Sequence, residues 1–268
     1  MSHSAIAASF PSRFSHVKLI AKGGMGEIYH AFDTVHQREV ALKTLNVDGG
    51  GFGELRARFS REARMLLDLD HPNIVKVFEI SDGPLPFISL EFIEGETLRK
   101  LINAGKFKNR DSMLGYADRL LDALQYSADK GILHRDIKPN NVLVSKEDNV
   151  KLIDFGLARG KLDPHLTQTG HRIGTPLYFS PERMEGKPAD IRSEIYSFGM
   201  MLYEMLTGTI PYPENELQYV LEGNKIPIRE RDSGIPEFIA DAVMTALAKN
   251  PSERHPGFAI FRQKLKSG

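Results

Sequence analysis

Two patterns of hydrophobic and polar residues divide the sequence near residue 94. Before this point, short apolar runs alternate with polar residues and predict strands at VKLI, EIYHAFD, EVALKTL, VKVFEI and PFISLEF. One stretch in this region, GELRARFSREARMLLDLD, has apolar residues at helical spacing and predicts a helix. We expect an α+β chain with a flexible tail over residues 1–12, a strand-rich lobe over 13–93 and a mainly helical lobe over 94–268.

The second part of the chain carries the longer helical patterns. In DSMLGYADRLLDALQYSADKG one stripe is apolar and the pattern ends at Gly131, a helix stop signal. The stripe consists of Met113, Ala117, Leu120, Leu121 and Leu124. IRSEIYSFGMMLYEMLTG is apolar nearly all round, which predicts a buried central helix. A further helix is predicted in IPEFIADAVMTALAKNP.

Composition narrows the classes of function. The chain has 35 basic and 35 acidic residues, so no net field would recruit nucleic acid. It has no cysteine, which excludes disulfides and cysteine nucleophiles and suits a reducing compartment. Its histidines never form the motif H-E-x-x-H, so the sequence shows no dedicated metal site of that kind. No run approaches the ~18 apolar residues that span a bilayer, so we expect no membrane segment in this chain.

A carboxylate and an amine in the first part form a candidate pair. Glu62 falls on the apolar face of the predicted helix, and a buried carboxylate needs a partner. Period-two alternation puts Ala41 and Lys43 on the same side of one strand, from which Lys43 could reach Glu62. The alternative is that Glu62 lies at the helix edge, in water.

The stretch AKGGMGEIY has three glycines between two predicted strands. It fits either a phosphate cradle or a tight hairpin, because glycine serves wherever φ is positive. Gly23 and Gly26 match the second and third glycines of the phosphate-loop spacing G-x-G-x-x-G. The first position is Ala21 instead.

The stretch HRDIKPNNVLVSKEDNVKLIDFG carries the strongest chemical signal. NVLV and NVKLI flank SKED and predict a hairpin centred between Glu147 and Asp148. Asn141 and Asp154 are then equidistant from the turn and face each other as two oxygen ligands. Magnesium suits such a site because it prefers oxygen ligands and shares its shell with phosphate and water.

Asp136 precedes this hairpin, with Lys138 between it and Asn141. A carboxylate, a cation and two metal ligands at one place supply a base for an attacking hydroxyl and positive charge for phosphoryl oxygens. The spacing therefore predicts phosphoryl transfer.

These motifs together resemble a known family. HRDIKPNN from His134, DFG from Asp154, VALK ending at Lys43 and SPE ending at Glu182 strongly resemble the eukaryotic-type protein kinases, and GGMGEIY favours their bacterial Ser/Thr branch. The resemblance runs from about Arg13 to the C-terminus. It implies one catalytic domain with the bilobal protein kinase fold: an antiparallel sheet plus one helix in the N-lobe, and a mainly helical C-lobe.

The resemblance assigns roles to the candidate residues. It implies that Asp136 is the catalytic base, that Lys138 contacts the transferred phosphate, and that Asn141 and Asp154 hold Mg²⁺, for which Mn²⁺ is an expected substitute. It also implies that Lys43, paired with Glu62, grips the α- and β-phosphates of ATP. The positions that it places around ATP are Ala21, Gly23, Gly26, Ile28, Ala41, Lys43, Leu90, Glu91, Ile93 and Leu143.

Within the ATP site, the resemblance makes Ala41 and Leu143 the two sides of the adenine slot and Leu90 the gatekeeper. The backbone of Glu91 and Ile93 would read the adenine edge. With the phosphate-grip lysine downstream, the glycine stretch is better interpreted as the phosphate cradle than as a simple hairpin.

Other positions are implied to be structural. His134 and Phe155 would belong, with Leu66 and Val77, to an apolar spine, and Arg254 would pair with Glu182. Glu194 stands where the family usually has Asp, whose carboxylate bonds the backbone of the catalytic loop. The extra methylene at Glu194 and the alanine at position 21 predict reduced activity or altered nucleotide affinity at most.

The long stretch GLARGKLDPHLTQTGHRIGTPLYFS predicts regulation. Thr167 and Thr169 resemble autophosphorylation sites of bacterial kinases, and Arg135 is the expected phosphate receiver, because phosphate binds arginine through charge-assisted bonds. Thr175 resembles the family threonine that contacts the catalytic aspartate and, like Lys138, indicates Ser/Thr specificity.

We therefore predict a Ser/Thr protein kinase that uses ATP and magnesium on protein Ser/Thr hydroxyls, including its own, with a transient homodimer where one molecule phosphorylates another. One alternative is a pseudokinase that binds nucleotide as a scaffold, motivated by Ala21 and Glu194. Another is a small-molecule phosphotransferase, which usually lacks the SPE segment. We expect a cytoplasmic domain, alone or as part of a longer, membrane-anchored protein.

Overall fold

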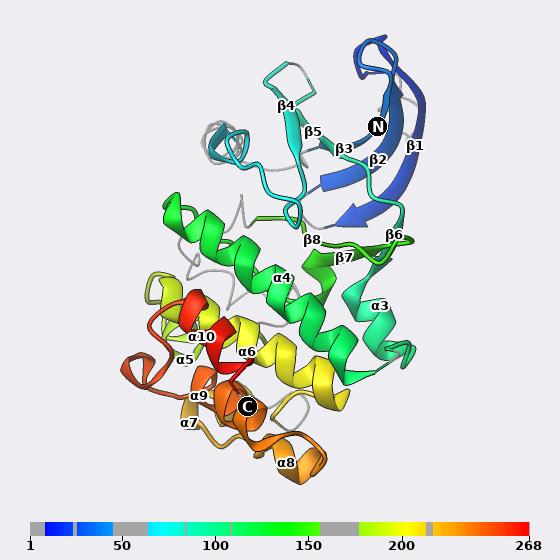
Figure 1. Ribbon diagram of the computed structural model, residues 1–268. Coiled ribbons are helices and arrows are strands. Elements are labelled where there is room, and N and C mark those ends of the chain that lie inside the picture. The colour runs from blue at the N-terminus through cyan, green and yellow to red at the C-terminus, as the bar shows by residue number, and fades with distance from the viewer. Residues whose placement is uncertain are drawn as a thin grey trace. The chain divides into compact units, whose positions relative to one another are not determined.

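The computed structural model describes residues 9–23, 26–44, 64–83, 85–107, 109–155, 177–212 and 217–267. The chain divides into two compact units, Met1–Glu94 and Gly95–Gly268. Figure 1 shows strands in the first unit and mainly helices in the second. The predicted α+β class is confirmed. The helix predicted around Leu55–Leu66 lies largely outside the described residues.

The first unit contains a five-stranded antiparallel sheet in the order β1-β2-β3-β5-β4. Its strands are β1 Phe14–Gly23, β2 Gly26–Asp33, β3 Arg38–Thr44, β4 Val77–Ser81 and β5 Phe87–Glu91. Burial in β3 alternates as the sequence predicts, with Val40, Leu42 and Thr44 buried and Ala41 and Lys43 on the opposite face. One face of the sheet therefore forms the core, and the other carries the predicted site residues.

The core of this sheet includes a residue from the predicted tail. Phe10 is buried, and its ring makes edge-to-face contacts with Tyr29 at 5.3 Å and Phe87 at 5.5 Å. Such aromatic pairs stabilise a core beyond the stabilisation that comes from burying the area of each ring. The prediction of a flexible tail is therefore wrong for Phe10, because this aromatic side chain caps the sheet's apolar face.

The second unit begins with a three-stranded antiparallel sheet in the order β6-β7-β8. Its strands are β6 Gly95–Thr97, β7 Val142–Ser145 and β8 Val150–Leu152. The helices of this unit are α3 Leu98–Asn103, α4 Arg110–Asp129, α5 Pro181–Met184, α6 Ile191–Thr207, α7 Leu217–Glu222, α8 Ile228–Arg231, α9 Glu237–Ala246 and α10 Phe258–Lys264, with 3-10 turns at Pro139–Asn141 and Pro251–Glu253.

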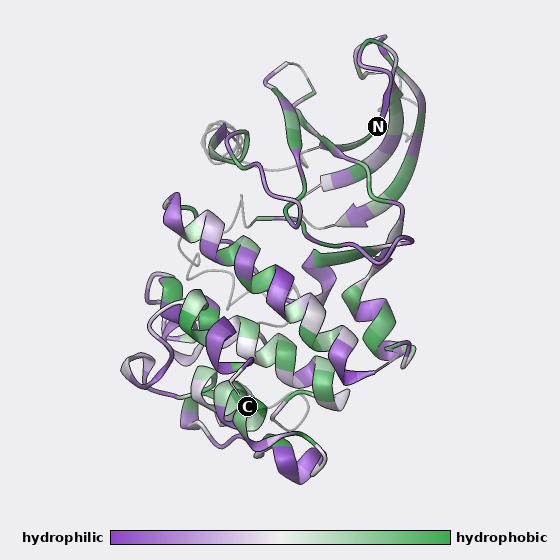
Figure 2. Cartoon of the chain, viewed as in Figure 1, coloured by the Kyte–Doolittle hydropathy of each residue, from purple (hydrophilic) through white to green (hydrophobic). Residues whose placement is uncertain are grey.

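The helix α6 is the centre of the second unit. Every residue from Ser193 to Leu206 is buried, which confirms the predicted central helix. A capping box at Asp190 and Ser193 starts the helix, and Gly208 ends it with φ of 76°. The helices α4, α9 and α10 pack against it. Figure 2 shows hydrophobic and hydrophilic residues alternating around α4, as expected for a helix with one buried stripe.

A buried ion pair joins α5 to the segment after α9. The guanidinium of Arg254 donates to both carboxylate oxygens of Glu182, at 2.7 and 2.8 Å, which confirms the predicted pair. It also donates to the backbone carbonyls of Ala248, Arg192 and Lys249. Burial and five hydrogen bonds make this arginine a fixed part of the fold.

We predict that Arg254→Met destabilises the protein by about 3 to 5 kcal/mol, because it leaves the Glu182 charge buried and unpaired. Urea unfolding measures this change. Arg262→Met is the matched control, since Arg262 pairs with Asp118 on a partly exposed surface and its loss should cost about 1 kcal/mol or less. A loss of similar size in both variants would contradict the prediction.

Candidate functional site

The sheet of the first unit aligns several predicted nucleotide contacts on one face. Ile28 lies opposite Lys43 between β2 and β3, and Ala41 lies opposite Leu90 between β3 and β5. Directly opposed residues of an antiparallel pair point to the same face. Ile28, Lys43, Ala41 and Leu90 therefore share the face that is not part of the core cluster.

The glycine turn continues this face. Ala21 lies opposite Ile28, and Gly23 lies opposite Gly26 at the end of the β1–β2 pair. Gly26 has φ of 156°, at the edge of the region that only glycine adopts readily. Gly24 and Met25 lie outside the described residues. The first position of the motif, Ala21, is thus an exposed strand residue beside the predicted phosphate contacts.

Lys76, directly before β4, restricts how Glu91 at the end of β5 can contact a base. The backbone N–H of Glu91 donates to the carbonyl of Lys76 at 2.9 Å, and its side chain accepts from the N–H of Lys76 at 3.2 Å. The N–H of Glu91 is therefore already used within the unit, and any adenine contact at this residue involves its carbonyl.

In the second unit, Asp136 is held by two neighbours. Lys138 Nζ donates to Asp136 Oδ2 at 2.8 Å. The amide nitrogen of Asn141 donates to the same carboxylate oxygen and to the Asp136 carbonyl, both at 2.8 Å. The structure therefore brings together three of the predicted residues, with the carboxylate fixed in position and the amide oxygen of Asn141 not used in these bonds.

His134 has the structural role that the sequence indicates. It is fully buried, its ring lies 4.5 Å from that of Phe155, and its Nε2–H donates to the Ile153 carbonyl at 3.0 Å. Its Nδ1 accepts from the Asp136 N–H at 3.3 Å. Burial lowers the pKa of His134 to about 4, although the charges of Asp136 and Asp154 act in the opposite direction. The imidazole is thus a neutral group that links the backbone of Asp136 to that of Ile153.

The hairpin β7–β8 differs from the predicted register by one residue. Val142 pairs with Leu152, and the Ile153 N–H donates to the Asn141 carbonyl at 2.9 Å. Asn141 thus lies opposite Ile153, and the prediction that it faces Asp154 is wrong. The physical reason is a three-residue loop between Ser145 and Asn149, instead of the two-residue turn that the prediction assumed.

Left-handed backbone conformations explain this geometry. Asp148, the last residue of the hairpin loop, has φ of 65°, which closes a three-residue loop. Asp154 follows the end of β8 with φ of 57°. Aspartate tolerates this region better than most residues. The position of Asp154 is therefore set by its own turn and not by strand pairing.

Glu194 makes the contact predicted for it. Its Oε1 accepts a hydrogen bond from the backbone N–H of Arg135, whose φ is 64°. The other oxygen, Oε2, is buried and has no hydrogen-bond partner among the described residues. Burial raises the pKa of the Glu194 carboxyl to about 7, although the N–H groups of Arg135 and His134 and the charge of Arg183 act in the opposite direction.

Some predicted site residues lie outside the described part of the chain. They are Glu62, Thr167, Thr169 and Thr175. Within the described part, no group of three or more His, Asp or Glu side chains could hold a metal ion. A site made of Asn141 and Asp154 would therefore depend on phosphate and water for its remaining ligands.

Sequence reasoning did not single out Arg183, which is buried and donates to the Arg135 carbonyl at 2.9 Å. The available signal was its position directly after Glu182 in the SPE motif. It also missed Arg99, which binds Glu204 and the Tyr178 hydroxyl inside the second unit. Long-range pairs of this kind leave no local periodicity.

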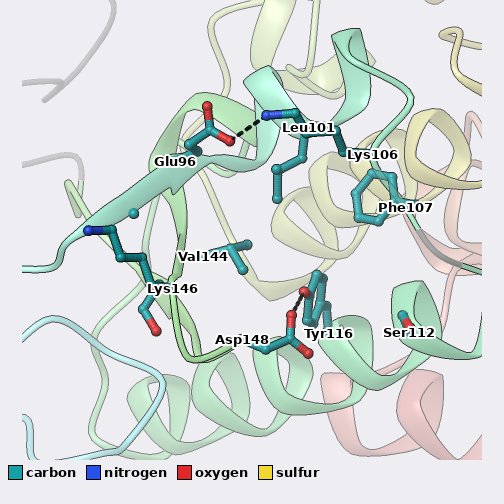
Figure 3. A pocket seen from close by; sticks show the side chains of 11 residues that line it. Glu96, Leu101, Lys106, Phe107, Ser112, Tyr116, Val144, Lys146 and Asp148 are labelled. Carbon is teal, nitrogen blue, oxygen red and sulfur yellow. Dashed lines mark hydrogen bonds and ion pairs between the residues drawn. The ribbon is translucent and has the colours of Figure 1, made fainter.

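A separate pocket of about 250 Å³ lies between α3, α4 and the β6–β7 strands. Figure 3 shows Glu96 joined to Lys106, and the Tyr116 hydroxyl joined to Asp148, at its edge. None of the predicted site residues lines this pocket. The polar side chains at its edge thus already have hydrogen-bond or ion-pair partners within the protein.

Comparisons with known proteins agree with this geometry. Residues 14–264 match the family model described as the protein kinase domain. A probable serine/threonine-protein kinase of Streptomyces coelicolor is 39% identical over 95% of this chain and 40% of its own length. The serine/threonine-protein kinase PknB of Mycobacterium leprae is 38% identical over 94% of this chain and 42% of its own length.

The fold has a solved counterpart as well. The crystal structure of the Mycobacterium tuberculosis PknI kinase domain aligns with a TM-score of 0.75, at 20% identity, over 97% of each chain. At this identity the likeness shows the fold alone. The expected protein kinase fold is confirmed.

The chain belongs to the protein kinase domain family. Within it, the chain is a catalytic domain of the bacterial Ser/Thr kinase type, as the sequence motifs predict. Such kinases use ATP with divalent metal ions and act on proteins. The chain spans about 40% of the length of the curated relatives it matches. In the described residues, no helix is long and apolar enough to cross a membrane.

We predict a pH-dependent cost of burying Glu194. Its pKa in the folded protein, about 7, lies above the ordinary value of 4.5. The stability that this carboxyl contributes is therefore complete below pH 4.5 and is lost as the pH rises through 7. Relative to Glu194→Gln, the free energy of unfolding of the wild type should fall by about 2 to 3 kcal/mol between about pH 5 and about pH 8.

Urea unfolding of both proteins at the two pH values measures this difference. Glu237→Gln, at an exposed carboxyl in the first turn of α9, is the matched control. If the free energies of unfolding of the wild type and Glu194→Gln differ by the same amount at both pH values, the buried carboxyl does not titrate in this range.

Proposed function

We propose that this domain transfers the γ-phosphate of ATP to Ser and Thr hydroxyls of proteins. The observation that carries the proposal is the arrangement of Asp136, whose carboxylate is held by Lys138 and by the amide of Asn141. A fixed carboxylate can accept the proton of an attacking hydroxyl, and the adjacent ammonium group can stabilise the charge on the transferred phosphoryl group.

The nucleotide would bind to the exposed face of the first unit's sheet. Lys43 would grip the α- and β-phosphates, with Glu62 as its partner, and Ala41 would contact one side of the adenine. The glycine turn would cover the phosphates, where Gly23 and Gly26 permit close backbone approach. The common face of Ile28, Ala41, Lys43 and Leu90 supports this assignment. We propose that Leu143 contacts the opposite side of adenine.

The two proposed metal ligands fit a hard divalent cation. The amide nitrogen of Asn141 is used by Asp136, which orients the amide oxygen as a ligand, and Asp154 adds a carboxylate. Oxygen donors of this kind suit Mg²⁺, with Mn²⁺ as a substitute. The metal ion would neutralise charge on the β- and γ-phosphates.

Regulation would act through residues outside the described part of the chain. We propose autophosphorylation at Thr167 and Thr169, with Arg135 as the phosphate receiver and Thr175 as a contact of Asp136. Arg135 lies directly before Asp136, so a phosphate bound there could order the site. Transfer between two molecules would require a transient homodimer. Use of ATP and the lack of cysteine favour a cytoplasmic location for this domain.

The main alternative is a nucleotide-binding scaffold without transfer activity. Glu194 and Ala21 motivated it, because both depart from the usual motif. The hydrogen bond from the Arg135 N–H to Glu194 argues against a disrupted loop. The held carboxylate of Asp136 also favours an active site over a scaffold.

We predict that incubation with Mg-ATP adds phosphate to the wild-type protein at Thr167 or Thr169, measured by intact-mass and peptide mass spectrometry. Asp136→Asn should abolish this gain, because it removes the base while keeping the shape of the side chain. Asp129→Asn is the matched control, since Asp129 is an exposed residue at the end of α4 that accepts a bond from Gln125.

If phosphatase-treated wild type gains no mass and phosphorylates no generic protein substrate while still binding ATP, the scaffold interpretation replaces this proposal. Phosphorylation of small molecules without transfer to protein would instead favour a small-molecule phosphotransferase.

A further inference from the structure

The backbone of Arg135 is held on both sides of its Cα by side chains distant in sequence. Its N–H donates to Glu194 on α6, and its carbonyl accepts from Arg183 Nη1 on α5 at 2.9 Å. The resemblance to kinases accounts for the first of these bonds only. Arg183 thus adds a second, independent hold on the residue that directly precedes Asp136.

Arg135 needs such support because of its backbone conformation. Its φ of 64° lies in the left-handed region, a backbone conformation that is unfavourable for residues other than glycine. Surrounding contacts must therefore fix this turn. The Asp136 N–H then donates to His134 Nδ1, so the orientation of Asp136 follows from that of the peptide before it.

The surroundings of Arg183 fix its guanidinium group. The residue is 7% exposed, and the guanidinium lies 3.9 Å from the centre of the Phe179 ring. A planar guanidinium stacks on an aromatic ring more effectively than an ammonium group does. The neighbouring Glu182 is bonded to Arg254 at both oxygens. The carboxylate beside Arg183 on α5 is thus already paired with another arginine.

Arg183 also balances a charge that the fold buries. Glu194 is 2% exposed, and its Oε2 has no hydrogen-bond partner in the described part of the chain. The charged groups that act on it are Arg183 and Arg135, and both lower the pKa of this carboxyl. An ionised carboxylate at this place therefore depends on a nearby positive charge.

We propose that Arg183 is a positioning residue for phosphoryl transfer: Glu194 binds the N–H of Arg135 and Arg183 binds its carbonyl, and the two side chains together clamp this residue and so fix the position of Asp136. This inference rests on the proposed kinase activity. It assigns to α5 a role in orienting the catalytic aspartate, in addition to the ion pair made by Glu182.

The test compares steady-state kinetics of the wild type, Arg183→Met and Arg183→Lys with ATP and a generic protein substrate. Arg183→Met keeps the apolar stem and removes the donor and the charge. We expect kcat to fall by about tenfold to a hundredfold, the cost of misplacing a reacting group by about 1 Å. The KM for ATP should stay within about twofold, because a lost positioning contact lowers kcat rather than uniform binding. Arg183→Lys should recover most of the lost kcat.

The matched control is Arg262→Met, which removes an arginine between α10 and α4 without touching the Arg135 peptide. Its kcat should equal that of the wild type. Arg183→Met should lower kcat by a smaller factor in the Glu194→Gln background than in the wild type, because mutations of residues that hold the same group have non-additive effects.

The outcomes separate the two proposals. An inactive wild type defeats the proposed function. An active wild type with unchanged kcat in Arg183→Met, or with a raised KM at constant kcat, overturns the role of Arg183. If Arg183→Met does not fold, Arg183→Gln takes its place: a kcat equal to that of the wild type would overturn the clamp, and a reduced kcat at constant KM would support it.

Discussion

The structure of the catalytic loop depends on one buried hydrogen bond, from the Arg135 N–H to the Glu194 carboxylate. The loop turns through a left-handed residue at this point, and such a turn persists only where its surroundings fix it. The capping box at Asp190 starts α6 and thereby places Glu194 in its first turn. Helix initiation, a buried carboxylate and the position of Asp136 are consequently parts of a single arrangement.

The same principle governs the other side of the site. In the β7–β8 hairpin, two aspartates adopt positive φ, one in the loop and one just after the strand. The three-residue loop shifts the pairing so that Asn141 meets Ile153. The Ile153 carbonyl accepts a hydrogen bond from the His134 imidazole. The other ring nitrogen of His134 accepts one from the Asp136 N–H. The two loops are therefore coupled through one buried histidine.

The sequence predicts much of this site because the chemistry is local. Asp136, Lys138 and Asn141 lie within six positions of one another, and their mutual bonds follow from a short turn. The alternation of β3 follows from its period-two pattern, and the burial of α6 follows from a sequence that is apolar nearly all round. The hairpin register could not be predicted, because SKEDN permits loops of two or three residues that differ by one left-handed residue. Arg183 was missed because its partner is a backbone carbonyl 48 positions away.

Two buried groups with opposite pKa shifts also limit how the catalytic loop responds to acid. The lowered pKa of His134 means that its contribution to stability is lost as the pH falls from 6.5 towards 4. The raised pKa of Glu194 means that its contribution grows as the pH falls from 7 towards 4.5. In the overlapping range, the folded protein binds one proton at Glu194, and the unfolded chain binds one at His134. The difference in bound protons from this pair is then close to zero, so its net effect on stability is nearly independent of pH. A buried acid on α6 and a buried base in the loop therefore offset each other, and this pair does not make the fold sensitive to mild acid.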